Sequence, residues 1–106
     1  MQKRIKLKTK TNFLLLAREI GYQLKAIKTL SDGIEEANYQ RYISRFAYPR
    51  FHLFVKKNNS NEIILSLHFD QKKPSYNGSS AHSGEYDGQL VKDEMERILK
   101  IIQRIE

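Results

Sequence analysis

Two adjacent segments with alternating side chains constrain this fold more than any other part of the sequence. Within residues 50–57, and again within residues 62–70, every second residue is apolar, and mostly polar side chains fill the positions between. Period-2 alternation of this kind is typical of strands with one buried face. The four residues between the segments, Asn-Asn-Ser-Asn, favour a reversal of the chain. The sequence therefore predicts an antiparallel hairpin.

The register of this hairpin follows from its apolar faces. A slip by one residue would turn the apolar side chains of one strand to the wrong side of the sheet. Among the registers that remain, we favour the one that places Arg50 opposite Asp70, because it pairs opposite charges. In this register His52 faces His68 on the side away from the aliphatic residues.

The segment after residue 31 allows two structures. Its Asp32-Gly33 pair can form the tight turn of a hairpin. Alternatively, Asp32 caps a helix with Glu35 three residues further on, and the apolar and aromatic residues that follow recur at helical spacing. We favour the helix, over residues 33–47.

Together these patterns predict a small α+β fold in a single domain, since 106 residues suffice for one core. The antiparallel sheet would contain strands over residues 22–30, 50–57 and 62–70. The helices would pack mainly on its aliphatic face, over residues 12–20, 33–47 and 89–105.

Two segments lie outside these elements. Residues 1–10 alternate basic and apolar side chains, which fits either an edge strand or a basic tail. Residues 71–88 form a Gly- and Ser-rich loop of a length that is usually functional or disordered. Because this loop contains Tyr76 and His82, we expect it to be ordered, with one of the two packed against the hairpin. We expect Asp87 to cap the final helix.

The composition excludes several classes of protein. The chain has no Cys, which excludes a disulfide scaffold, a thiol nucleophile and Cys-ligated metal sites. No apolar run is long enough to span a bilayer, and the basic N-terminus lacks the apolar stretch of a signal peptide. We therefore expect a cytoplasmic protein that does not bind membranes.

The charge is distributed unevenly along the chain. Before residue 58 there are 13 basic and four acidic residues, a net charge of +9, whereas the remainder has six basic and eight acidic residues. Basic side chains interleaved with aromatic ones are typical of surfaces that neutralise phosphates and stack on unpaired bases. The sequence therefore predicts a nucleic-acid-binding domain, for RNA or single strands. The candidate contacts are Lys6, Lys8, Lys10, Arg41, Tyr42, Arg45, Arg50, Lys56 and Lys57.

The histidines indicate an alternative function. His52, His68 and Asp70 share one side of the predicted hairpin, and His82 lies in the loop that follows. Two imidazoles and a carboxylate suffice to bind a divalent ion such as Zn²⁺, Mn²⁺ or Ni²⁺ with open coordination positions. The alternative is therefore a metal-dependent hydrolase of nuclease or phosphoesterase type. The same pattern also fits a partly exposed histidine pair without a chemical role.

A second alternative is a homodimeric interaction module. Apolar residues follow a 4-3-4-3 spacing along the predicted final helix, at Val91, Met95, Ile98, Ile102 and Ile105. Such a stripe either joins the core of its own domain or pairs with a second copy. We therefore expect a monomer or a homodimer.

Overall fold

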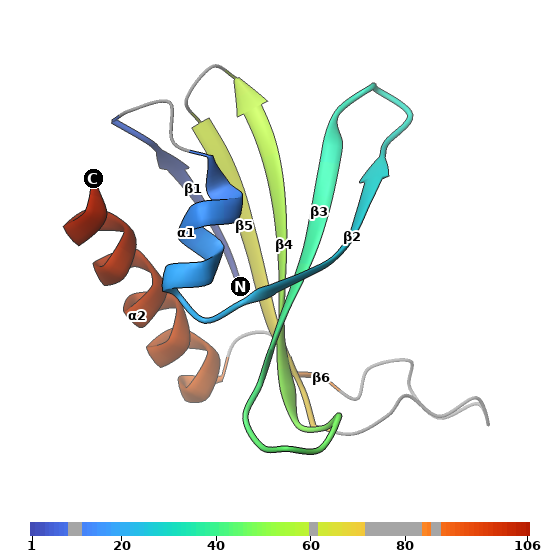
Figure 1. Ribbon diagram of the computed structural model, residues 1–106, viewed down its shortest axis with the longest axis vertical. Coiled ribbons are helices and arrows are strands. Elements are labelled where there is room, and N and C mark those ends of the chain that lie inside the picture. Colours follow the sequence, from blue (N-terminus) through green and yellow to red (C-terminus); the bar gives the residue numbers. More distant parts are fainter. Residues whose placement is uncertain (9–11, 60–61, 72–83, 86–87) are drawn as a thin grey trace.

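The computed structural model describes residues 1–8, 12–59, 62–71, 84–85 and 88–106. Within these residues the fold is α+β, as predicted, with two helices packed on one face of an antiparallel sheet (Figure 1). The strands follow one another across the sheet in the order β1-β5-β4-β3-β2, and the short β6 pairs with the end of β5. The elements are β1 (Gln2–Lys6), α1 (Phe13–Glu19), β2 (Gln23–Thr29), β3 (Glu35–Tyr42), β4 (Arg50–Asn59), β5 (Glu62–Asp70), β6 (Gly84–Glu85) and α2 (Gln89–Ile105).

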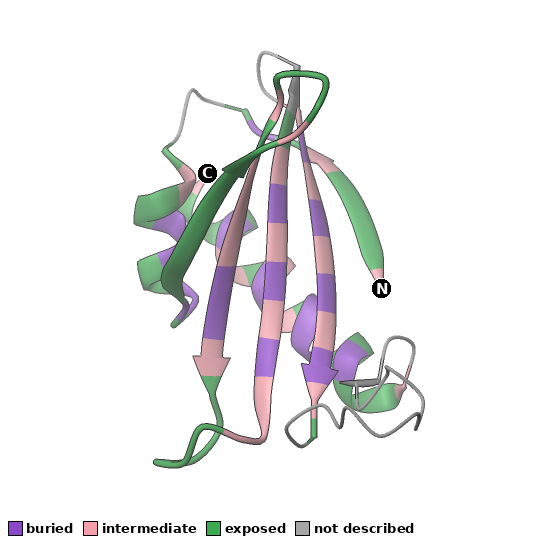
Figure 2. Cartoon of the chain, turned by 90° about the vertical axis from the view of Figure 1, so that its right-hand side faces the viewer, coloured by how far each residue is buried: buried purple, intermediate pink, exposed green. Residues whose placement is uncertain are grey.

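The central hairpin, β4 and β5, has the predicted register. Arg50 lies opposite Asp70, and His52 lies opposite His68. Figure 2 shows the consequence as an alternation of buried and half-buried residues along these strands. The apolar alternation therefore fixes which residues face the helices.

The core lies between the sheet and the two helices. One cluster of buried side chains includes Leu53, Leu65 and Leu67 from the sheet. Four of the five residues of the α2 stripe are buried in it, so this stripe packs within its own chain and a homodimer stays a prediction. The helices contribute Leu16, Ala17, Ile20, Val91, Met95, Ile98 and Ile102 to the core.

The prediction of a helix over residues 33–47 is wrong. This segment contains β3, which forms a hairpin with β2, so the hairpin alternative is the observed structure. Gly33 has a φ of 84°, a left-handed conformation that reverses the chain into β3. The Leu30 N–H donates to Ile34 O at 2.8 Å, and the Asp32 carboxylate accepts from the Ile34 N–H at 3.0 Å. β3 then pairs along the edge of β4, which satisfies its backbone groups. The apolar side chain of Phe46, which the predicted helix would bury, is 65% exposed.

The predictions for residues 1–10 and for the starts of the two helices are confirmed only in part. β1 pairs with β5 at the edge of the sheet, which confirms the edge-strand alternative for residues 2–6. Helix α1 begins where predicted, with the Asn12 side chain accepting from the Leu14 N–H at 3.0 Å. The N-cap of α2 is Gly88 rather than Asp87, and Asp87 lies outside the described residues. Tyr76 also lies outside them, so its predicted packing against the hairpin stays a prediction.

A buried carboxylate ties α2 to the rest of the fold. Glu94 accepts a hydrogen bond from the Tyr22 hydroxyl at 2.7 Å and a pair of hydrogen bonds from Arg97 at 2.8 and 2.9 Å. Arg41 of β3 lies 3.4 Å from the same carboxylate, and Arg97 also donates to Ile20 O at the end of α1. This cluster joins both helices to the sheet through one side chain.

The opposite face of the sheet carries neither helix. It is turned toward the viewer in Figure 2, with both helices behind the strands. In the part of the chain described here, no helix combines the length and apolar character required to cross a membrane. This face, on which neither helix packs, is called the open face. Its side chains from β1, β3, β4 and β5 are Gln2, Arg4, Lys6, Glu36, Asn38, Gln40, Tyr42, Arg50, His52, Phe54, Lys56, Glu62, Ile64, Ser66, His68 and Asp70.

Candidate metal centre

Two histidines and an aspartate meet on the open face. His52 of β4 lies opposite His68 of β5, and the ring centroids are 5.2 Å apart. Asp70 projects to the same side because it is two residues beyond His68 in the same strand. One potential ligand atom from each residue lies within 4.8 Å of the other two. This cluster, His52, His68 and Asp70, could hold a metal ion.

Both ring nitrogens of His52 have partners. Its Nδ1 contacts the Asp70 carboxylate, and its Nε2 lies 2.8 Å from Gln40 Nε2. Gln40 is oriented by Tyr42, whose hydroxyl donates to Gln40 Oε1 at 3.1 Å. The amide nitrogen of Gln40 is therefore the donor to His52 Nε2, and in the neutral form of the ring the proton lies on Nδ1 and points at Asp70.

Asp70 is held in its ionised form. Burial by itself would raise the pKa of Asp70, but the hydrogen bond from His52 and the nearby charges of His52 and His68 hold it below its usual value. The Arg50 guanidinium adds a contact of 3.5 Å to the same carboxylate. Arg50 is in turn fixed by the Tyr48 hydroxyl, which accepts its hydrogen bond at 2.9 Å. A carboxylate in this state can serve as an anionic ligand at neutral pH.

The surroundings of His68 favour the neutral form of its ring. Burial lowers the pKa of its imidazole, the charge of Asp70 opposes this, and the charges of His52 and of the N-terminal ammonium lower it further. A neutral imidazole keeps the lone pair that binds a metal ion. His68 therefore has the protonation state that ligation requires.

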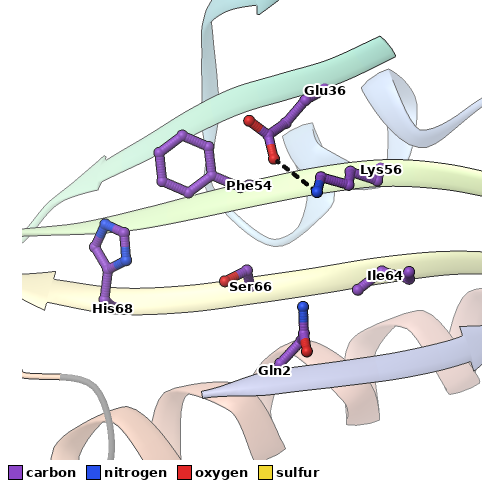
Figure 3. Close-up of a pocket in the computed structure, with 7 residues that line it drawn as sticks. All are labelled: Gln2, Glu36, Phe54, Lys56, Ile64, Ser66 and His68. Carbon is purple, nitrogen blue, oxygen red and sulfur yellow. Dashed lines mark ion pairs between the residues drawn. The ribbon is translucent and has the colours of Figure 1, made fainter. Parts of the chain in front are cut away.

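A groove adjoins this cluster on the open face. Its volume is about 280 Å³, and it crosses four strands of the sheet (Figure 3). Lys56 and Glu36 form an ion pair of 3.7 Å at one end, and His68 lies at the other. The lining residues are Gln2, Glu36, Phe54, Lys56, Ile64, Ser66 and His68.

Not all of the site residues predicted from the sequence share this face. Arg41 faces the helices and pairs with Glu94, and the Arg45 guanidinium lies over the Phe46 ring, with 5.5 Å to its centroid, in the β3–β4 connection. Lys8 follows β1, and its N–H donates to the Glu106 carboxylate at 2.6 Å. The structure places Lys6, Tyr42, Arg50 and Lys56 on the open face, whereas Lys57 points to the opposite face and Lys10 and His82 lie outside the described residues.

Sequence reasoning missed Gln40 as a partner of the cluster. Gln40 was assigned to the predicted helix, in which it has no relation to His52. The signal that could have found it is the Asp32-Gly33 pair, because a hairpin turn at this pair places Gln40 in a strand. Phe54 is one of the aromatic residues interleaved with the basic side chains, but its place beside both histidines depends on the sheet.

Comparisons with protein-family models, with curated proteins and with solved structures each find no match for this chain. The chemistry of the site therefore follows from its own residues. Two imidazole donors and one carboxylate, on a sheet face without a covering helix, define it.

Proposed function

We propose that this protein is a metal-dependent hydrolase whose ion is bound by His52, His68 and Asp70. The observation that carries the proposal is the convergence of these three donors within 4.8 Å on the open face. An ion bound at His52 Nδ1 would take the place of the ring proton there, and the neutral imidazole would carry that proton on Nε2 instead, with the Gln40 amide as its partner. Arg50 and Gln40 are then the residues that hold two of the ligands in position.

The donor types indicate which ion fits. Imidazole nitrogens suit Zn²⁺, Ni²⁺ and Mn²⁺ better than Mg²⁺ or Ca²⁺, which prefer oxygen ligands. With two nitrogens and one carboxylate oxygen, Zn²⁺ is the first choice, and Mn²⁺ and Ni²⁺ are the alternatives. The absence of Cys from the chain is consistent with a centre built from nitrogen and oxygen donors.

The location of the centre supports a catalytic rather than a structural role. Structural zinc sites have four protein ligands, whereas catalytic sites keep a position open for water or substrate. Among the described residues the cluster supplies three protein donors, and it lies beside a groove of about 280 Å³. When bound, a divalent ion supplies a Lewis acid for a substrate oxygen and activates water for hydrolysis. The net positive charge of the chain, +7, favours an anionic substrate such as a phosphoester.

Metal binding is tested by the melting temperature of the metal-free protein with added Zn²⁺, Mn²⁺ or Ni²⁺. A ligand that binds the folded state at about 100 times its Kd stabilises that state by about 2.7 kcal/mol. For a domain of this size we expect a rise of about 10 °C. His68→Gln should abolish the rise. The matched control is Lys57→Gln, which introduces the same side chain on the opposite face of the neighbouring strand and should keep it.

Hydrolysis is tested with bis(4-nitrophenyl) phosphate under the same conditions. We expect release of nitrophenolate that depends on the added ion and is lost in His68→Gln. Equal melting temperatures with and without all three ions would refute the metal centre. Metal binding without nitrophenolate release would refute the hydrolase and leave a metal-binding protein.

A further inference from the structure

We propose that the groove beside the metal centre binds single-stranded nucleic acid, with a base stacked on Phe54 and the backbone phosphates along the basic side chains of the open face. This inference rests on the proposed hydrolase, since it names the substrate class of that site. Three features of the open face favour a polynucleotide over a small phosphoester: its aromatic surface, the size of the groove and the charge around it.

Phe54 provides the stacking surface. Its half-buried ring lies on the open face beside the two histidines, with ring centroids 5.8 Å from His52 and 5.4 Å from His68. The His52 ring is inclined by only 28° to the Phe54 ring and stacks with it, which holds the orientation of Phe54. Bases stack on aromatic side chains in proteins that bind single strands, and every base offers a flat face for this contact.

The size and polarity of the groove fit one nucleotide unit better than a larger ligand. A volume of about 280 Å³ lies at the lower end of the range for ligand pockets. Gln2 and Ser66 line it with amide and hydroxyl groups that can donate to and accept from a base edge (Figure 3). Ile64 supplies an apolar wall. The combination of one aromatic surface with neutral polar groups is the chemistry that a base requires.

The charge of the open face is complementary to phosphates. Lys56 is held by Glu36 at 3.7 Å, and Arg4 by Glu62 at 3.7 Å, and both basic side chains are substantially exposed. Exposed ion pairs of this kind contribute little, so phosphate oxygens can compete for the cations. Among the described residues, the basic side chains on this face are Arg4, Lys6, Lys25, Lys28, Arg50 and Lys56, against the acidic Glu36, Glu62 and Asp70.

The groove and the metal centre are adjacent on the open face. His68 belongs to both, because it lines the groove and contributes a donor to the cluster. A nucleotide with its base on Phe54 therefore has its backbone within reach of the ion. Duplex nucleic acid does not present an unpaired base to Phe54, so we expect the open face to discriminate against it.

The experiment measures fluorescence anisotropy of labelled oligonucleotides of about 12 residues, oligo(U), oligo(dT) and a duplex, with the intact protein in EDTA. We expect binding of the single strands that weakens with rising salt, and much weaker binding of the duplex. Phe54→Leu should weaken binding about tenfold or more, whereas Phe54→Tyr, which keeps a flat ring, should retain it. The matched control is Phe46→Leu, the same substitution at an exposed aromatic residue in the β3–β4 connection, which should bind like the wild type.

Two adjacent lysines on opposite faces test which face of the sheet binds the nucleic acid. Lys56→Gln should reduce the slope of log affinity against log salt by about one, because it removes one phosphate contact. Lys57→Gln, on the opposite face, should leave that slope unchanged. Equal effects of the two substitutions would contradict binding on the open face.

The outcomes separate this inference from the proposed hydrolase. No binding at low salt, or equal affinity of Phe54→Leu and wild type, overturns the inference while metal-induced stabilisation still supports the metal centre. Displacement of the oligonucleotide by polyglutamate as effectively as by unlabelled single strand shows an unspecific polyanion surface, and this also overturns it. Single-strand binding without any metal-induced stabilisation supports the inferred surface and refutes the metal centre.

Discussion

Gln40 and His52 lie opposite each other in β3 and β4, with their Nε2 atoms 2.8 Å apart, and this contact fixes which nitrogen of His52 faces Asp70. Gln40 is itself oriented by Tyr42 and is only 8% exposed. The ligand geometry of the cluster therefore depends on a residue that carries no charge and would not bind the ion itself.

The substitution Gln40→Met should weaken metal binding while the fold is kept. Methionine fills a similar volume but cannot hydrogen-bond to His52 Nε2 in either tautomer, so the ring loses the partner that orients it. Loss of such a supporting hydrogen bond commonly lowers metal affinity by about 10- to 100-fold. Isothermal titration with Zn²⁺ measures the change. Gln23→Met, the same substitution in β2 at the position opposite Gln40, should leave the affinity unchanged, and equal affinity of both variants would contradict this role of Gln40.

The conformation of Gly33, in the turn between β2 and β3, predicts whether a substitution there raises or lowers the stability of the fold. Its φ of 84° lies in the region that L residues avoid, and no atom would contact an added Cβ within 4 Å. Gly33→Ala should therefore destabilise the fold through backbone strain alone, by about 1 kcal/mol. Urea unfolding measures this difference. Asn tolerates positive φ, so Gly33→Asn should lose less stability than Gly33→Ala. A stabilising effect of Ala would instead fit the helix that the structure excludes.

The error over residues 33–47 has a physical cause. The hydrogen bond from the Ile34 N–H to the Asp32 carboxylate forms in a turn as readily as in a helix cap, so the local sequence does not distinguish the two structures. Pairing with β4 decides between them, and this is a contact between distant segments. The β4–β5 hairpin was predictable because its alternation, turn residues and charge pairing all agree within a short segment.

The candidate site also contains a part that the local sequence predicts and a part that depends on contacts between distant segments. His52, His68 and Asp70 lie on one hairpin, so their shared face follows from the period of a strand. Gln40 comes from the segment whose structure was predicted wrongly, and the groove combines side chains from four strands. The strand order that brings β1 and β3 to the two sides of the hairpin is a property of the whole sheet, which the sequence pattern does not specify.

The carboxylate of Glu94 should contribute strongly to stability. It is buried, and it accepts hydrogen bonds from Tyr22 and Arg97 while Arg41 lies 3.4 Å away. Glu94→Gln removes the negative charge and leaves the two arginines without compensation, which should cost about 2 kcal/mol or more. Glu96→Gln, at an exposed position of the same helix, should change the free energy of unfolding by less than about 0.5 kcal/mol. Similar values for both variants in urea unfolding would show that the cluster does not stabilise the fold.

The same cluster predicts a loss of stability at alkaline pH. Burial, followed by the charge of Glu94 and the hydrogen bond to it, raises the pKa of Tyr22. In the unfolded chain a tyrosine releases its proton near pH 10, about where the folded protein still keeps it on Tyr22. The unfolded state therefore binds fewer protons above this pH, and stability falls as pH rises. Comparison of wild type with Tyr22→Phe at about pH 7 and about pH 10.5 should show a smaller loss for the variant. Equal losses would contradict the protonated state of Tyr22 in the folded protein.

The most direct test of the metal centre is the NMR spectrum of the histidine side chains in ¹⁵N-labelled protein before and after addition of equimolar Zn²⁺. In the metal-free protein we expect the His52 ring proton on Nδ1, where the Asp70 carboxylate accepts it. With Zn²⁺ that proton should move from Nδ1 to Nε2, and ring nitrogens of both His52 and His68 should shift to positions typical of ligated imidazole. Unchanged signals from these two rings in the presence of Zn²⁺ would contradict a metal centre at His52, His68 and Asp70.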